Sequence, residues 1–177
     1  AVSTKISSAD LHLLVIGEDA QTDSTATRWL GSSVYAKLIA GREGGAPPPV
    51  DLEAEKLHGE FVRSMIADGL VHAAHDISDG GLLFCLVEML MDTAIGAELT
   101  APEHDVHGWA FGEHQSRYIL ATSQPEQIIQ RAQAANIPLM PLGKTDNSGE
   151  LTVTGNDPIS ISGLLDLSEN VIPGRMS

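Results

Sequence analysis

The chain has 177 residues, of which 42% are hydrophobic and 19% charged, a composition typical of one globular domain over residues 1–177. No apolar run approaches the roughly 18 residues that a membrane-spanning helix needs, so we expect no membrane partner. The formal net charge of −14 leaves no basic face to bind phosphates by counterion release, which disfavours nucleic acid as a partner.

The single cysteine is Cys85, within an apolar run. One cysteine builds neither a disulfide framework nor a thiolate zinc site within the chain, which fits a reducing, cytoplasmic location. No base stands beside Cys85 in the sequence, so we expect it in the core. The chain opens with a polar lead-in and no initiator Met, and we expect it to be a fragment of a longer multidomain polypeptide.

The first elements are a strand and a short helix. Residues 12–17 form an apolar run ended by a glycine, which predicts a buried strand. Residues 33–40 carry apolar side chains at helical spacing and are followed by Gly41, a helix end. Two consecutive glycines and three consecutive prolines exclude regular structure from residues 41–49.

Two longer helices follow. Asp51 is the predicted N-cap of a helix that ends at Gly69. Its expected buried face consists of Leu57, Phe61, Met65 and Ile66. Residues 70–74 resume as a strand, and residues 82–92 form a helix that is apolar nearly all round, which predicts burial on most of its faces.

The second half is richer in strands. The predicted strands are residues 96–99, 116–122, 139–143 and 151–153, and the predicted helices are residues 125–135 and 163–169. Mixed strands and helices in this order predict an α+β fold, a layered α/β/α domain with a mixed, largely antiparallel sheet covered by helices.

The strongest candidate site is the sequence HDISDGG, which lies between a predicted strand and the apolar helix. Its candidate ligand contacts are Asp76, Ser78, Asp79, Gly80 and Gly81. The glycines allow a tight turn, and free N–H groups at a helix start bind anions. The two carboxylates repel a bare phosphate, so they favour a metal-phosphate site or hydrogen bonds to a substrate. Alternatively, Asp79 or Ser78 only caps the helix.

A second candidate is the turn formed by Gly31, Ser32 and Ser33, which opens the short helix. Its backbone amides and hydroxyls are suited to bind an anion in the same way. An ordinary N-cap is the alternative interpretation of the same residues.

A third candidate precedes the strand at residues 116–122, where Glu113 and Arg117 are possible ligand contacts. The alternative is a solvated ion pair between the two side chains.

No complete catalytic motif is present. The sequence lacks a G-x-S-x-G elbow, a G-x-x-x-x-G-K-[ST] phosphate loop and a G-x-G-x-x-G dinucleotide turn. The pairs His72 and His75, and His104 and His107, lack a third ligand at fixed spacing, which disfavours zinc. We therefore assign no catalytic residue and leave the metal ligands open.

Three ordered segments resemble a known family. These are GGAPPPVDLE at residues 44–53, AHDISDGGL at residues 74–82, and the Gly112-Glu113 pair followed by Arg117-Tyr118. Together they resemble the C-terminal domain of the phosphoribosylformylglycinamidine synthase family. The wider superfamily includes aminoimidazole ribonucleotide synthetase, selenophosphate synthetase, thiamine-monophosphate kinase and a hydrogenase maturation factor, and the resemblance implies their C-terminal fold.

The resemblance also implies a function. Members convert formylglycinamide ribonucleotide and glutamine-derived ammonia to the amidine, using ATP and Mg²⁺. Implied partners are the N-terminal ATP-binding domains of the same chain, a glutaminase subunit and a small accessory subunit. This chain resembles the second of two C-terminal domains, which is linked with an auxiliary nucleotide site. It lacks the ATP signature and catalytic histidine of the N-terminal domains, so alone we expect it to be inactive.

The family places the segment 76–81 at the ligand-facing edge, with residues 31–33 and Arg117 as weaker candidates. Two departures are His114, where the family has an acidic residue, and the unmatched ending at residues 167–177. The alternatives are a C-terminal domain of aminoimidazole ribonucleotide synthetase or selenophosphate synthetase, and a non-catalytic assembly module.

Overall fold

A computed structural model describes residues 2–17 and 30–176, with side chains described as far as Glu169. The strands are β1 (His12–Ile16), β2 (Ala73–Asp76), β3 (Gly96–Leu99), β4 (Tyr118–Thr122), β5 (Leu139–Asp146), β6 (Glu150–Val153) and β7 (Ile159–Ser160). The helices are α1 (Val34–Leu38), α2 (Leu52–Ala67), α3 (Gly81–Leu90), α4 (Val106–Phe111), α5 (Pro125–Ala134) and α6 (Ile161–Met176). No helix in this part of the chain is long and apolar enough to cross a membrane.

The described strands form one sheet in the order β2-β4-β1-β5-β3-β6-β7. Neighbouring strands are antiparallel except β3 and β6, which run parallel. The predicted α+β class, with a mixed and largely antiparallel sheet, is confirmed. β1 lies inside the sheet, where Val15 pairs with Ile119 of β4 and with Met140 of β5. Both edges of β1 are therefore paired, and the burial of both of its faces explains its uninterrupted apolar sequence.

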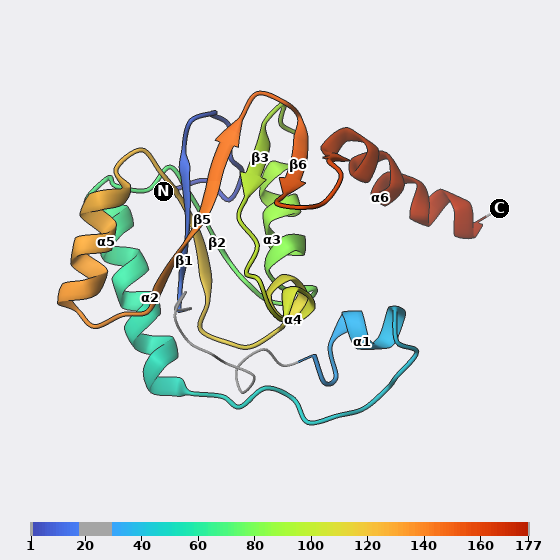
Figure 1. The fold of residues 1–177 in the computed structure, drawn as a ribbon, viewed down its shortest axis with the longest axis horizontal. Coiled ribbons are helices and arrows are strands. Elements are labelled where there is room, and N and C mark those ends of the chain that lie inside the picture. The colour runs from blue at the N-terminus through green and yellow to red at the C-terminus, as the bar shows by residue number, and fades with distance from the viewer. Residues whose placement is uncertain (1, 18–29, 177) are drawn as a thin grey trace.

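Helices cover both faces of the sheet (Figure 1), with α3 and α4 on one side and α2 and α5 on the other. Alternation along β1 sends Leu13 and Val15 into the first core and Leu14 and Ile16 into the second. Each of these four side chains is at most 1% exposed. Burial of a side chain of this size contributes about 1.5 to 3 kcal/mol, so β1 anchors both layers.

Helix α2 begins at the predicted cap, because Asp51 accepts hydrogen bonds from the amides of Glu53 and Ala54, both at 3.0 Å. The prediction of its buried face is wrong at one position. Leu57 is 46% exposed, whereas the next residue, His58, is buried. The His58 ring lies with Nδ1 2.8 Å from the carbonyl of Ser116, to which it donates. A buried imidazole is stable here because its polar atom has a partner.

Other elements also differ from the expectations. The strand expected at residues 70–74 forms at Ala73–Asp76, because Leu70 and Val71 are buried by packing against the second core and not by strand pairing. The last helix spans Ile161–Met176 and extends away from the sheet (Figure 1). α4 and β7 were not expected from the sequence.

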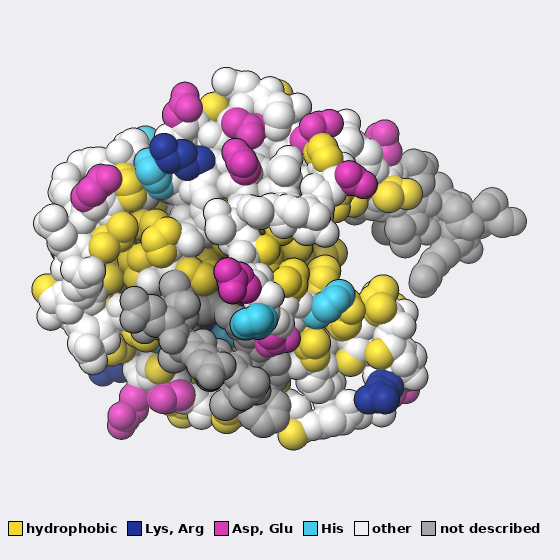
Figure 2. All heavy atoms as spheres, in the orientation of Figure 1, with side chains coloured by type: hydrophobic (Ala, Val, Ile, Leu, Met, Phe, Trp, Pro, Cys, Tyr) yellow, Lys and Arg dark blue, Asp and Glu magenta, His cyan; other side chains and the backbone are white. Residues whose placement is uncertain are grey.

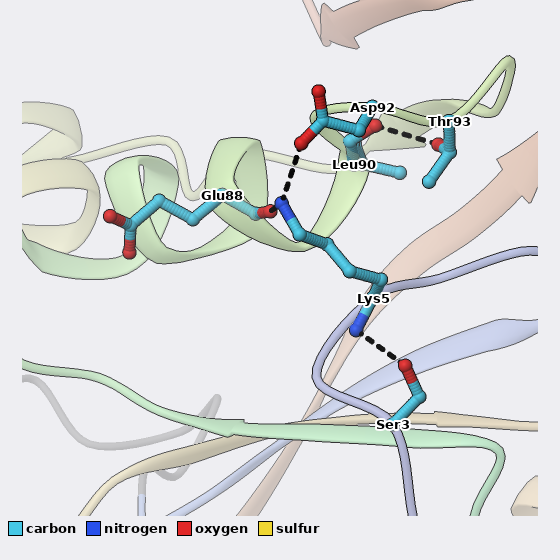
Figure 3. A network of polar contacts seen from close by, with 6 residues as sticks. All are labelled: Ser3, Lys5, Glu88, Leu90, Asp92 and Thr93. Atoms are coloured by element: carbon cyan, nitrogen blue, oxygen red, sulfur yellow. Dashed lines mark hydrogen bonds and ion pairs between the residues drawn. The ribbon is translucent and has the colours of Figure 1, made fainter.

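An N-terminal arm contacts the end of α3 through Lys5 (Figure 3). Ser3 of this arm forms a parallel bridge with Ala73 at the edge strand β2. Lys5 Nζ donates to the carbonyl of Glu88 at 2.9 Å and lies 3.5 Å from the Asp92 carboxylate, near the C-terminus of α3. Ile6, the next residue along the chain, is fully buried. A cation near free carbonyls at a helix C-terminus is stabilising, so the arm holds α3 against the sheet.

Candidate functional site

The HDISDGG segment forms the turn from β2 into α3. Gly80 and Gly81 both have positive φ angles, +83° and +75°. A Cβ atom on Gly81 would lie 2.6 Å from the backbone of Phe111, and one on Gly80 would lie 2.7 Å from the ring of Phe84. Both positions therefore require glycine for conformation and for space. The close approach of Gly81 brings the start of α3 directly against the end of α4.

Helix α3 begins without a side-chain cap. Its N-cap is Gly80, and no side chain accepts a hydrogen bond in the capping position. Ser78 and Asp79 are exposed on the turn, and Asp76 has a largely exposed side chain. The interpretation that Ser78 or Asp79 caps the helix is wrong, so both side chains are directed to solvent at the edge of the sheet.

The Gly80 amide is bound by a side chain from a distant part of the sequence. It donates to Glu113 Oε1 at 2.8 Å. The same oxygen accepts the amide of Val34, the first residue of α1, at 2.9 Å. The carboxylate thus joins the starts of two helices, which are the two turns that the sequence singled out as anion sites. Carboxylates are favoured at helix starts for the same electrostatic reason as phosphates.

Gly31, Ser32 and Ser33 form a compact turn before α1. Ser33 is the N-cap, as the alternative interpretation expected, because its hydroxyl accepts the amide of Ala36 at 3.0 Å. Ser32 has a φ angle of +59° and donates its hydroxyl to the carbonyl of Gly45 at 2.8 Å. A Cβ on Gly31 would lie 2.9 Å from the carbonyl oxygen of Ala46. The turn is therefore packed against the glycine-rich residues that follow α1.

A shallow hollow of about 320 Å³ adjoins this turn. Its lining is Ser32, Ser33, Val34, Lys37, Arg42, Glu43 and Gly44. Lys37 and Glu43 form an exposed ion pair across it at 3.3 Å. Hydrophobic side chains gather over α1 beside the hollow, at the lower right of Figure 2. Leu38 and Ile39 contribute to this apolar surface, since each is 71% exposed.

Arg117 lies inside the protein and not at the ligand-facing edge. Its side chain is 1% exposed. The guanidinium donates to the backbone carbonyls of Gly112 and His114, the latter at 3.3 Å. These two carbonyls flank Glu113 in sequence. The described contacts of Arg117 therefore hold the backbone that presents the Glu113 carboxylate.

Cys85 lies one turn into α3 and is buried as expected. Its thiol donates to the carbonyl of Asp76 at 3.3 Å. The pKa of the Cys85 thiol is raised from 9.0 to about 12, mainly by burial and secondarily by the nearby Asp76 and Glu88 charges, against which Arg117 acts in the opposite direction. The thiolate is the reactive form, so this cysteine is not a nucleophile near neutral pH.

A second polar cluster lies behind the site and was not expected from the sequence. Glu55 of α2 accepts hydrogen bonds from the hydroxyls of Tyr118 and Ser116, both at 2.9 Å. Partial burial and the hydrogen bond to Glu55 raise the pKa of Tyr118 to about 12. An open hollow of about 440 Å³ adjoins Glu55 and Tyr118. Ser116 and Tyr118 lie 61 and 63 positions after Glu55, so no local sequence pattern predicts these contacts.

Asp76 and Asp79 are the exposed carboxylates of the turn from β2 into α3. Among the described residues, no group of three or more His, Cys, Asp or Glu side chains is placed to hold a metal ion. Mg²⁺ in phosphate-transferring enzymes usually takes one or two carboxylates and completes its shell with water and phosphate oxygens. The exposed carboxylates of Asp76 and Asp79 match that smaller contribution.

Comparison with known proteins adds the family. The AIR synthase related protein, C-terminal domain, family matches residues 13–156. The phosphoribosylformylglycinamidine synthase subunit PurL of Methylocella silvestris is 48% identical over 153 residues, covering 84% of this chain and 20% of that protein. The subunit of the same name from Rhodospirillum rubrum is 40% identical over 179 residues, covering 100% of this chain and 24% of that protein. The chain thus spans about a fifth to a quarter of the length of these relatives.

Solved structures show the same fold. Thermotoga maritima PurL complexed with FGAR superposes with a TM-score of 0.70 at 19% identity, covering 92% of this chain and 29% of that one. Thiamine-monophosphate kinase from Stenotrophomonas maltophilia reaches a TM-score of 0.54 at 16% identity, covering 88% and 54%. Identities this low bear on the fold alone. Since the family match spans most of the sheet and its covering helices, the chain belongs to the AIR synthase related C-terminal domain family.

Proposed function

We propose that this chain is the second C-terminal domain of a phosphoribosylformylglycinamidine synthase, the ATP-dependent ligase that forms the amidine in purine biosynthesis. The observation that carries the proposal is the identity of 40 to 48% to PurL subunits over 84 to 100% of the chain. The sequence similarity therefore favours the synthase over other members of the superfamily.

The proposed ligand-facing edge is the turn from β2 into α3. Asp76, Ser78 and Asp79 are exposed there, and none of them caps α3. Ser78 supplies a hydroxyl donor for a phosphate oxygen, and the two carboxylates supply oxygen ligands for Mg²⁺. Bound Mg-ATP supplies the phosphoryl group for activation of the amide oxygen. The residues of this chain bind and orient the nucleotide phosphates, and the chemistry requires further domains.

The proposed partners are the N-terminal ATP-binding domains of the same polypeptide, together with a glutaminase subunit and a small accessory subunit, in the cytoplasm. PurLQS from Thermotoga maritima is among the structural relatives, with a TM-score of 0.67. Phe84 supports docking of another domain near the edge, because this large apolar side chain is 54% exposed on the first turn of α3. An isolated chain of this kind is expected to be inactive.

Calorimetric titration with Mg-ADP and Mg-ATP tests the nucleotide contacts. Micromolar binding that is lost in Asp79→Ala places the phosphates at the turn. The matched control is Asp157→Ala, which removes an exposed carboxylate from another turn and should bind as the wild type does. Binding that survives Asp79→Ala would contradict the assignment of Asp79. Absence of heat with all three proteins would mean that the nucleotide contacts need the N-terminal domains.

A domain exchange tests the synthase assignment. This chain replaces the corresponding fifth of the Methylocella silvestris PurL subunit, and ADP formation is measured with formylglycinamide ribonucleotide and ammonia. Activity dependent on that substrate is expected. Equal activity after Asp76→Ala and Asp79→Ala would favour a non-catalytic assembly module. A folded but inactive chimera would favour a domain from aminoimidazole ribonucleotide synthetase or selenophosphate synthetase.

A further inference from the structure

The backbone at Ser116 is strained and held from two sides. Its φ angle is +66°, in the left-handed region that a serine rarely adopts. The hydroxyl donates to Glu55 Oε2 at 2.9 Å, and the carbonyl accepts from His58 Nδ1 at 2.8 Å. A residue stays in such a conformation only when its surroundings over-determine it, and such positions gather at functional sites. Here helix α2 provides the surroundings.

The turn that contains Ser116 is also held from inside. Buried Arg117 donates to the carbonyls of Gly112 and His114. A buried guanidinium that binds backbone carbonyls fixes their direction, because each lost hydrogen bond would leave a polar group unsatisfied. The backbone on both sides of Glu113 is thereby fixed by α2 and by the interior.

This turn carries the half-buried side chain of Glu113. A single oxygen, Oε1, accepts the Gly80 amide at 2.8 Å and the Val34 amide at 2.9 Å. Hydrogen bonds to an ionised acceptor are roughly twice as strong as neutral ones. Because the two donors share one acceptor atom, the starts of α3 and α1 keep a fixed separation for as long as Glu113 stays in place.

Two further contacts tie α1 to the same region. Tyr35 donates its hydroxyl to, or accepts from, His107 Nδ1 at 2.9 Å, and its ring stacks on Phe111 with centroids 4.9 Å apart. Both partners lie on α4, directly before the Glu113 turn. α1 is therefore joined at three places to the element that carries Glu113.

We propose that Glu113 is a positioning residue that sets the Gly80 amide at the ligand-facing edge and couples it to α1. The ligand role of that edge rests on the proposed function, whereas the coupling of the two segments rests on the contacts alone. Loss of the carboxylate should release both amides together, although they are 46 positions apart in the sequence.

Amide hydrogen exchange followed by NMR tests the coupling. Glu113→Gln keeps an acceptor oxygen without charge and should raise exchange of the Val34 and Gly80 amides about tenfold, and Glu113→Ala should raise it about a hundredfold. The melting temperature of Glu113→Gln should stay within about 2 °C of the wild type, because the two cores are untouched. The control Glu103→Gln removes an exposed carboxylate from the loop before α4 and should leave both amides unchanged.

Unchanged exchange in Glu113→Gln and Glu113→Ala would overturn the inference, and so would release of one amide without the other. Mg-ADP titration separates this result from the proposed function. Asp79→Ala should weaken nucleotide binding and leave Val34 exchange unchanged, whereas Glu113→Gln should weaken binding about tenfold and accelerate exchange. Coupled exchange with a nucleotide affinity that Asp79→Ala does not change would refute the ligand assignment alone.

Discussion

The turns that begin α1 and α3 are built from similar glycine and serine residues and are supported in different ways. The α3 turn leads into a helix in which Leu82, Leu86 and Leu90 are fully buried. The α1 turn leads into a helix of five residues, at the end of which Leu38 and Ile39 are largely exposed. Core packing fixes the first turn. The second depends on its own Ser33 cap and on contacts with Glu113, His107 and Phe111.

The difference shows that turn chemistry does not determine rigidity. Local residues select the backbone conformation of both turns. Packing against residues distant in the sequence decides how much free energy is needed to unfold each turn. The following predictions test this contrast, beginning with the largest effect.

Gly81→Ala should lower the free energy of unfolding by about 3 to 5 kcal/mol, because strain at a positive φ angle adds to a clash with the Phe111 backbone. Urea denaturation measures the change. Gly41→Ala is the control, since Gly41 also has a positive φ angle and an added Cβ meets nothing within 4 Å. It should cost only about 1 to 2 kcal/mol. Equal losses would show that the close approach at Gly81 is unimportant.

Leu86→Ala should cost about 2 to 5 kcal/mol, because it removes a fully buried side chain from α3 and leaves a cavity. Leu38→Ala is the matched substitution in α1 and should change the free energy of unfolding by less than about 0.5 kcal/mol, since this leucine is 71% exposed. Both are measured by the same denaturation. A large loss in Leu38→Ala would mean that α1 is packed as firmly as α3.

The Cys85 thiol should make stability fall at alkaline pH. Its pKa is about 12 in the folded chain and near 9.0 when exposed. Between these values the unfolded state releases the proton first, so stability is lost as pH rises above about 9, by about 1 kcal/mol at pH 10. Comparing the urea stability of the wild type with that of Cys85→Ala from pH 8 to pH 10 isolates the effect, since Tyr118 is common to both proteins. Parallel curves would contradict it.

Removal of a helix cap should have the smallest effects on stability, and these effects should differ between α2 and α1. Asp51→Ala removes the cap of α2 and should lower global stability by about 1 kcal/mol. Ser33→Ala removes the cap of α1 and should change global stability by less than about 0.5 kcal/mol. Its effect should appear as faster hydrogen exchange of the Ala36 amide. A global loss as large as that of Asp51→Ala would place α1 in the cooperative unit.

The fold was predictable where one local pattern decided the structure. The strand His12–Ile16 begins where the apolar run does, and Gly96–Leu99 matches its expected bounds. α4 was missed because its six residues are too few for a helical period and include a glycine. β7 has two residues and carries no pattern. The error at Leu57 arose because one face was assigned from apolarity alone, whereas His58 is buried through its bond to Ser116.

The candidate site was predictable only in part. The need for glycine at positions 80 and 81 follows from the sequence of the turn, and the structure gives it a steric cause. The two hydrogen bonds that Glu113 accepts could not be predicted from local sequence patterns, because the donating amides of Gly80 and Val34 lie 33 and 79 positions away. Arg117 was expected as a ligand contact because it belongs to one of the segments that resemble the family, but it is buried. The buried guanidinium is stabilised by backbone carbonyls to which it donates hydrogen bonds, and their arrangement depends on the tertiary structure.

The interior place of β1 has a consequence for synthesis on the ribosome. Among the described strands β1 is made before the others, and its partners β4 and β5 begin only at Tyr118 and Leu139. At about 5 to 20 residues per second, β1 waits roughly 5 to 25 seconds before either neighbour exists. During that time its apolar residues have no native strand to pair with. The nascent chain is therefore expected to be a chaperone client until its second half emerges.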